Sequence, residues 1–201
     1  MKTSPTSANA RFSALVRLLA DDGIESTGLE GNDLHLALSA LALDLPAFLR
    51  TLLVADGTVT MAIEAYYAEP VDVITISQSL EELQVALPTF VSEQGEQVLY
   101  REVMLQGRQS NRRYATAYSL IRKSAVGQRL YQALVDEQVG IGTLLRNTAK
   151  GSYREILKLR TGGLDVEGDQ DQLRVNRTYC VYLDAAPGIL ITEVFPVSPY
   201  L

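Results

Sequence analysis

The sequence has very little of the side chains that most often bind metal ions or form disulfides. Cys180 and His35 are its single cysteine and its single histidine among 201 residues. One cysteine cannot form an internal disulfide, so nothing indicates an oxidising compartment. One cysteine and one histidine are also no ligand set for zinc or another transition metal, and we expect no metal site. We interpret Cys180 as a small buried hydrophobe in a strand and assign His35 no role.

Basic charge is also scarce. Lysine and arginine contribute 18 positive charges against 24 negative ones, which gives a net charge of −6. A chain with this balance has no general field that attracts phosphate backbones, so we expect no nucleic-acid partner. An anionic small molecule could still bind, but it would need a local cationic group.

Long apolar runs and nucleotide-binding motifs are missing too. The first twelve residues lack the apolar core of a signal peptide, and the apolar region 34–48 is broken by Asp44 and Pro46 before it could span a bilayer. Neither GxGxxG nor GxxxxGK[ST] occurs. We therefore expect a bacterial-type cytoplasmic protein that does not insert into membranes. Residues 1–10 read as a flexible tail.

What the chain does contain is the composition of one globular domain. Hydrophobic residues make up 47% and charged residues 21%, and the length fits a single domain, which we expect over residues 11–201. Apolar residues recur with helical spacing over 12–19, and a second helical region covers 33–54 with a break near Pro46. A turn at residues 56–58 precedes a third helix, with Thr58 as its N-cap.

The second half of the chain changes largely to the period-two pattern of strands. About five strands are expected, mostly joined by hairpins, with helices covering one face or the ends of an antiparallel sheet. This pattern is typical of an α+β domain. The strand-like runs are 71–77, 97–106, 113–122, 152–160, 175–183 and 188–195, with helical stretches at 126–134 and 143–149 and an acidic loop at 161–172.

Two charged residues interrupt the apolar faces of these predicted strands. Alternation puts Arg101 on the same face as Val103, and Glu193 on the same face as Ile191 and Phe195. Burying either charge alone would cost roughly several kcal/mol, so each needs a partner or a ligand.

Two interpretations of these charges remain open at this point. Arg101 and Glu193 could form a structural salt bridge with each other, or a shifted register could turn them towards water. Alternatively, Arg101 binds a substrate carboxylate through its planar fork and Glu193 transfers a proton. The helix starts after Gly57 and at residues 140–142 could present backbone N–H groups to an anion, although these glycines could equally be plain turn residues.

Four segments that contain these residues resemble the chorismate lyase (chorismate pyruvate-lyase, 4-hydroxybenzoate synthase) family, in its divergent cyanobacterial and actinobacterial branch. The segments are LLVADGTVT, LYREVMLQG, VGIGTLL and ILITEVFPVSPY. Their order and spacing agree with the family over about residues 49–201. The last segment is the most specific, because the family ends its final core strand with a T-E-hydrophobic-F pattern.

The resemblance implies a monomeric α+β fold whose antiparallel sheet carries an enclosed ligand site. It also implies an enzyme that converts chorismate into 4-hydroxybenzoate and pyruvate without a cofactor. The family's ligand-binding arginine falls on Arg101 and its essential glutamate on Glu193, which makes these the expected catalytic residues. Its two backbone contacts fall near Val59, with Thr58 or Thr60 as alternatives, and on Ile141.

This sequence departs from the family at the second arginine of the well-studied branch, where Tyr118 stands. The second substrate carboxylate would then be held by the Tyr118 hydroxyl, by Arg177 or by Arg154. By the same resemblance we expect the product to enter the biosynthesis of quinones, plastoquinone first and ubiquinone also, with phenolic lipids as the alternative. The alternatives are a non-catalytic sensor domain of the same fold that binds an aromatic carboxylate, and an interaction domain with a plain salt bridge.

Overall fold

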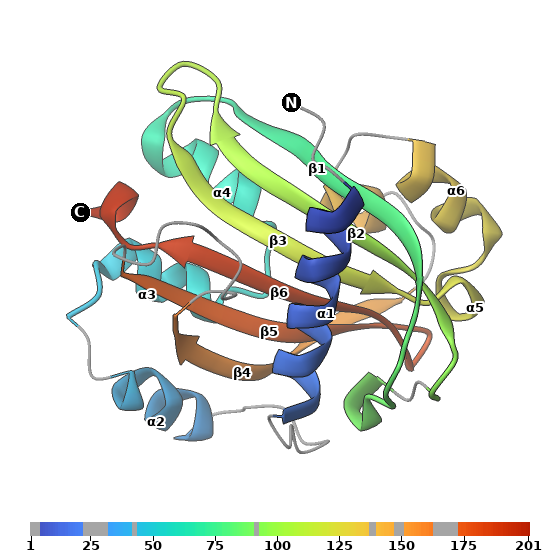
Figure 1. Ribbon diagram of the computed structural model, residues 1–201. Helices are drawn as coiled ribbons and strands as arrows, with labels where there is room; N and C mark the ends of the chain where they lie inside the picture. The colour runs from blue at the N-terminus through green and yellow to red at the C-terminus, as the bar shows by residue number, and fades with distance from the viewer. Residues whose placement is uncertain are drawn as a thin grey trace.

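The centre of the computed structural model is an antiparallel sheet with the strand order β1-β2-β3-β6-β5-β4 (Figure 1). The structure describes residues 5–21, 32–41, 44–90, 93–136, 140–146, 151–162 and 173–201. Its strands are β1 (Val71–Glu82), β2 (Gln97–Gly107), β3 (Arg113–Ile121), β4 (Ser152–Thr161), β5 (Arg174–Leu183) and β6 (Ala186–Pro196). All six strand-like runs are present as strands, which confirms the α+β prediction.

The turn of the β5–β6 hairpin is tighter than the sequence suggested. The two predicted runs, 175–183 and 188–195, leave four residues between them, but Leu183 pairs with Ala186 and Tyr182 with Pro187. Asp184 and Ala185 alone make the turn, with φ values of 50° and 67°. Two positive φ angles give a short loop the twist that matches the flanking strands.

The helices lie in the predicted helical regions, with two differences in detail. The helices are α1 (Pro5–Asp21), α2 (Asn32–Ala40), α3 (Ala47–Val54), α4 (Val59–Tyr67), α5 (Lys123–Val126), α6 (Gln128–Asp136) and α7 (Ile141–Arg146), with 3-10 turns η1 (Pro88–Phe90) and η2 (Ser198–Tyr200). The stretch 126–134 is divided between α5 and α6 at Gly127, and residues 147–149 of the stretch 143–149 lie outside the described residues. The predicted tail over residues 1–10 is wrong for residues 5–10, because α1 begins at Pro5, and proline suits a first helical position that needs no N–H. Most of the predicted acidic loop, residues 163–172, lies outside the described residues.

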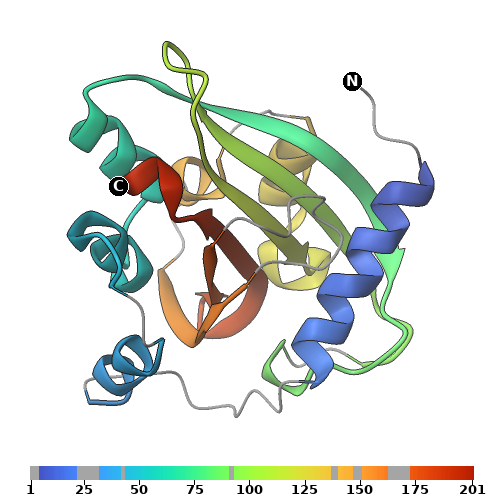
Figure 2. The ribbon, with the colours of Figure 1, turned by 60° about the vertical axis from the view of Figure 1, so that its left-hand side comes forward.

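Helices cover both faces of the sheet, whereas one face or the ends had been expected. Figure 2 shows α1 on one side of the sheet and α3 and α4 on the other. Leu15 and Val16 of α1 are buried in one cluster with Tyr100 and Leu120 of the sheet. Within the described part of the chain, no helix is long and apolar enough to cross a membrane.

The two faces of each strand belong to different cores, as the period-two pattern predicted. In β2, Val98 and Tyr100 join the cluster under α1. Leu99 and Val103 join a cluster on the opposite face, together with residues of α5, α6 and α7. Arg101 lies two residues from both Leu99 and Val103 and shares their face, so its side chain leaves the sheet on the face away from α1.

Candidate functional site

Arg101 and Glu193 line one cavity on the face of the sheet opposite α1. Both are buried, with exposed fractions of 1% and 7%. The cavity lies between the sheet and the first residues of α4 and α7. Its other described lining residues are Gly57, Thr58, Val59, Thr60, Val73, Val103, Leu105, Ala117, Ser119, Gly140, Ile141, Gly142, Arg154, Tyr179, Val181 and Ile191.

The Glu193 carboxylate is held at both of its oxygens by residues of β5. Arg177 Nε donates to Oε2 at 2.7 Å, and the Tyr179 hydroxyl donates to Oε1 at 3.1 Å. Burial, and after it the Glu193 charge, raises the pKa of Tyr179, so its hydroxyl stays protonated and remains a donor. The carboxylate is therefore fixed in position and neutralised by an ion pair that sequence reasoning did not assign to it.

Arg177 connects this carboxylate to the end of α3. Its Nη1 donates to the carbonyl oxygens of Leu52 at 2.6 Å and Ala55 at 2.8 Å. These carbonyls belong to the C-terminal turn of α3, where the helix dipole favours a positive charge. Burial opposes the charge on Arg177, but Glu193 and Tyr179 outweigh it and raise its pKa. All of these contacts stabilise the charged guanidinium.

Arg101 reaches the same cavity from β2. Its Nη2 donates to Thr75 Oγ1 at 3.4 Å, on the neighbouring strand β1 beside a register shift between Thr75 and Ser77. Burial lowers the pKa of Arg101, which means that the positive charge stands in a poorly solvated environment. An anion that entered the cavity would relieve this desolvation and gain a planar, five-donor partner.

Two helix starts line the cavity, and they contain Val59 and Ile141, for which the resemblance implies backbone contacts to the ligand. The first backbone bond of α4 runs from Ala62 N–H to Thr58 O at 3.2 Å, so the N–H groups of Val59 and Thr60 precede the helical ladder. Thr58 occupies the predicted N-cap position, without a side-chain capping bond. At the start of α7, Gly142 lies against Thr58, since an added Cβ would stand 3.2 Å from Thr58 Cγ2.

Arg154 is a further cation of this cavity and comes from the edge strand β4. Its Nη1 donates to the backbone oxygen of Asp56 at 3.1 Å and lies 3.4 Å from Asp56 Oδ1. The sequence had offered Arg154, Arg177 and Tyr118 as holders of a second carboxylate. Of these three residues, Arg154 is the one in the described lining of the cavity.

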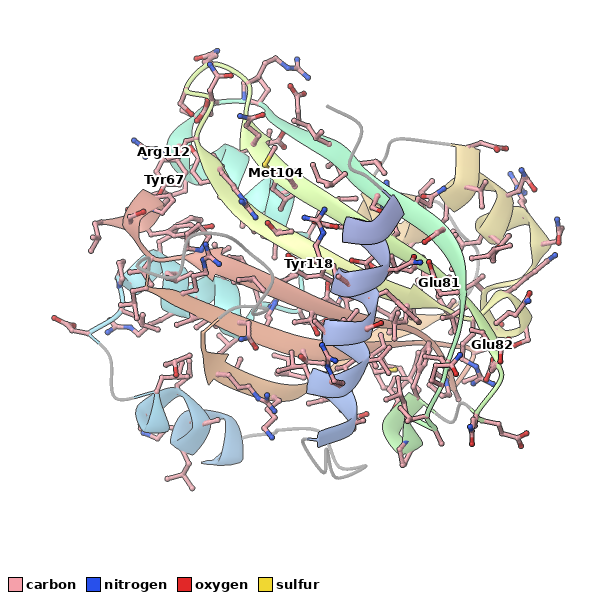
Figure 3. The ribbon with its side chains drawn as sticks, viewed as in Figure 1. Tyr67, Glu81, Glu82, Met104, Arg112 and Tyr118 are labelled. Carbon is pink, nitrogen blue, oxygen red and sulfur yellow. The ribbon has the colours of Figure 1, made fainter. Side chains whose placement is uncertain are left out.

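The prediction for Tyr118 put its side chain on the wrong face of the sheet. Tyr118 is fully buried in the cluster under α1, with Tyr100 and Leu120, and Figure 3 shows it beside that helix. Its neighbours Ala117 and Ser119 line the cavity instead. Because successive strand residues alternate, Tyr118 cannot reach a ligand that touches these two.

Among the described residues, no group of three or more His, Cys, Asp and Glu side chains is placed to hold a metal ion. The charged residues in the described lining are instead Arg101, Arg154 and Glu193, and Arg177 contacts Glu193 from outside the lining. Such a set suits a ligand with more than one negative charge and a reaction that moves a proton.

Comparison with solved structures identifies the fold. PhnF from Mycobacterium smegmatis matches with a TM-score of 0.58 at 12% identity, over 72% of this chain and 66% of that one, which is less than two thirds of its length. The separate effector domain of PhnF matches with a TM-score of 0.57 at 13% identity, over 72% of this chain and 91% of that domain. No curated protein matches the sequence.

An antiparallel sheet under helical covers, with a charged cavity on one face, defines the chorismate lyase-like class of α+β folds. A family model described as "Chorismate pyruvate-lyase Rv2949c-like" matches residues 53–201. The chain belongs to this family. The match includes Arg101, Glu193 and both helix starts, and it leaves α1 and α2 outside.

Proposed function

We propose that this protein is a chorismate pyruvate-lyase that converts chorismate into 4-hydroxybenzoate and pyruvate. One observation carries the proposal: the buried Arg101 and the Arg177-paired Glu193 line the same cavity, next to two helix starts. Family membership over residues 53–201 supports it independently. Chorismate is a dianion, and this arrangement offers cations and backbone N–H groups beside buried side chains.

The reaction balances without a second substrate. The C4–H bond gives its electron pair to a new C3–C4 double bond, which completes the aromatic ring. The C3–O bond breaks and its electron pair leaves with the enolpyruvyl oxygen. The proton from C4 is finally placed on the methylene carbon of the enolpyruvate, which gives pyruvate. The protein has to fix this geometry, balance the moving charge and transfer one proton.

The contacts of Glu193 suggest its part in this sequence. A carboxylate that is paired with Arg177 and bonded by Tyr179 is held as a proton acceptor beside the ring. We assign Glu193 the removal of the C4 proton and Arg101 the orientation of a substrate carboxylate. The N–H groups at Val59 and Ile141 would contact the ligand from the helix side. The roles of Glu193, Arg101 and these two N–H groups are predictions for this chain.

The test is an assay of purified protein with chorismate that follows pyruvate and 4-hydroxybenzoate together. The two products should appear in equal amounts, and absence of both at high protein concentration would refute the lyase function. Glu193→Gln and Arg101→Met should each lower kcat/KM by about a hundredfold or more. Leu80→Ala, a substitution at an exposed position of β1 outside the described cavity lining, should change neither rate nor melting temperature.

A second candidate is a domain that binds an aromatic carboxylate without converting it. The likeness to the effector domain of PhnF supports it, because that structure matches over nearly its whole length. Binding of 4-hydroxybenzoate in the absence of any turnover of chorismate would favour this candidate.

We also infer that the product serves quinone biosynthesis, with plastoquinone as the first candidate, and that the protein acts as a monomer. The basis is the resemblance to the cyanobacterial branch of the family. Loss of quinone on deletion of the gene, restored by added 4-hydroxybenzoate, is the expected outcome. Unchanged quinone levels would refute the quinone assignment and favour another phenolic product.

A further inference from the structure

Arg154 stands between two cavities. One is the cavity of Arg101 and Glu193, and the other, of about 160 Å³, is lined by Asp56, Glu155 and Arg177 among others. Arg154 and Tyr179 line both. A side chain with space on two sides can change its hydrogen-bond partner without displacing packed neighbours.

The present partner of Arg154 is a weak one. Only Nη1 is engaged, by Asp56 O at 3.1 Å and Asp56 Oδ1 at 3.4 Å. The Asp56 side chain is 70% exposed, and ion pairs to exposed carboxylates contribute little because water competes for both charges. Within the described residues, Nε and Nη2 of Arg154 hold no protein hydrogen bond, and Nη2 lies beside Gly142.

Arg177, the other arginine near Glu193, is not available in this way. Its donors are directed to Glu193, Leu52 O and Ala55 O at 2.6 to 2.8 Å, and its exposed fraction is 1%. An anion that took Arg177 would leave the Glu193 charge and two helix-end carbonyls without their donor. Arg154 donates only to Asp56 among the described residues, so an anion could bind it without leaving a buried group unpaired.

The strand order places Glu193 between Arg101 and Arg154 across the sheet. Arg101 lies on β2, Glu193 on β6 and Arg154 on β4, so the carboxylate of Glu193 comes from a strand between those of the two cations. A substrate with carboxylates at its two ends would then bring its middle, where the bonds change, towards Glu193.

We propose that Arg154 binds the second carboxylate of the substrate, that of the enolpyruvyl group, and leaves Asp56 to do so. This inference rests on the proposed lyase function, since it takes the substrate to be chorismate. Arg101 then holds the ring carboxylate, and the planar fork of Arg154 gives the three-carbon end its orientation.

The test uses two inert ligands of equal shape, 3-(carboxymethoxy)benzoate with two carboxylates and 3-isobutoxybenzoate with one. Titration calorimetry should show that the native protein prefers the dicarboxylate. Arg154→Gln should weaken the dicarboxylate about tenfold or more and the monocarboxylate less than about twofold. Asp56→Asn should leave dicarboxylate binding intact or strengthen it. Arg160→Gln removes a positive charge from the same strand outside both cavities and serves as the matched control.

Three results would overturn the proposal: no preference of the native protein for the dicarboxylate, equal weakening of both ligands by Arg154→Gln, or an unchanged KM for chorismate in that variant. The binding experiment needs no turnover. Selective loss of the dicarboxylate in a protein that does not convert chorismate would therefore refute the lyase function and keep the Arg154 assignment. Turnover of chorismate with an unchanged KM in Arg154→Gln would support the lyase function and refute the Arg154 assignment.

Discussion

Arg177 and Glu193 are direct partners across the β5–β6 ladder, and Arg177 Nε lies 2.7 Å from Glu193 Oε2. The pair has exposed side-chain fractions of 1% and 9%, so water does little to stabilise either charge alone. Arg177 also holds the end of α3 through two carbonyl oxygens. One guanidinium thus links the catalytic candidate, the sheet and a covering helix.

Removing Arg177 should therefore cost stability as well as activity. We expect Arg177→Met to lower the free energy of unfolding by about 3–5 kcal/mol, because it leaves a buried carboxylate without its cation. The double variant Arg177→Met with Glu193→Gln should regain part of that stability and none of the activity. Urea unfolding of the four proteins of this cycle measures the coupling, and a coupling near zero would contradict the role given to the pair.

Gly142 should be the glycine least tolerant of a methyl group at this site. A Cβ there would stand 3.2 Å from Thr58 Cγ2 and 3.3 Å from Thr58 Oγ1, which is tighter than ordinary packing. Gly142→Ala should separate the two helix starts and raise KM severalfold, and Thr58→Ser should reverse part of that rise. Gly151→Ala, with nothing within 4 Å of its added Cβ, is the control. Equal kinetics for both alanine variants would argue against close packing at the site.

Glu69 should give the fold a dependence on acid that is separate from catalysis. Hydrogen bonds from Tyr114, from the Ser110 hydroxyl and from backbone N–H groups lower its pKa from 4.5 to about 2. A carboxylate with a lowered pKa in the folded state stabilises the protein above its unfolded pKa, and this stabilisation is lost as the pH falls through the folded value. The stability difference between the native protein and Glu69→Gln should be constant near pH 7 and shrink between about pH 4.5 and pH 2.

The control for this pH series is Asp72→Asn. The pKa of Asp72 is also lowered, by the hydrogen bond from Arg108. The side chains of Asp72 and Arg108 are both exposed, however, and water competes for the pair. Its effect at pH 7 should be much the smaller of the two. Thermal unfolding at a series of pH values measures both variants, and a Glu69→Gln difference that grows on acidification would show the assignment to be wrong.

The packing of α1 should matter for stability and not for ligand binding. Leu15 has an exposed fraction of 1% on the face of the sheet remote from the cavity. Leu15→Ala should lower the free energy of unfolding by about 2–4 kcal/mol while the affinity for 4-hydroxybenzoate stays the same. Leu80→Ala, at a position 62% exposed, should have almost no effect on either quantity. A change in affinity with Leu15→Ala would imply coupling between the two faces.

The sequence predicted the strands and the face of each charged residue, because side chains alternate strictly along a strand. The inward direction of Arg101 and Glu193 followed from this alone. The partner of Glu193 did not, since it depends on a register shift opposite Val181 and Tyr182, where β6 has the extra residue Gly188. With the pairing of Leu183 and Ala186 continued unbroken, Glu193 would oppose Asn176. The local signal of this bulge is Gly188 itself, because a glycine inside a strand often marks one.

The error for Tyr118 has a related cause. Matching an arginine position of a distant family member to this strand needs the alignment to be right to one residue, and a slip of one residue reverses the face. Alternation with Ala117 and Ser119 could have signalled the problem, because these small residues leave space for a ligand and Tyr118 does not share their side. The sequence also could not predict that helices cover both faces of the sheet. The apolar stripe of an amphipathic helix indicates that the helix packs on something, but it does not indicate on which face of a sheet.

The position of α1 has a consequence for how this family can diversify. The helix packs on the sheet face opposite the described lining residues of the cavity, and it precedes the segment that the family model matches. A different apolar helix on this face would leave the described cavity lining unchanged. Substitutions in α1 should therefore alter how long the protein stays folded without altering what it binds.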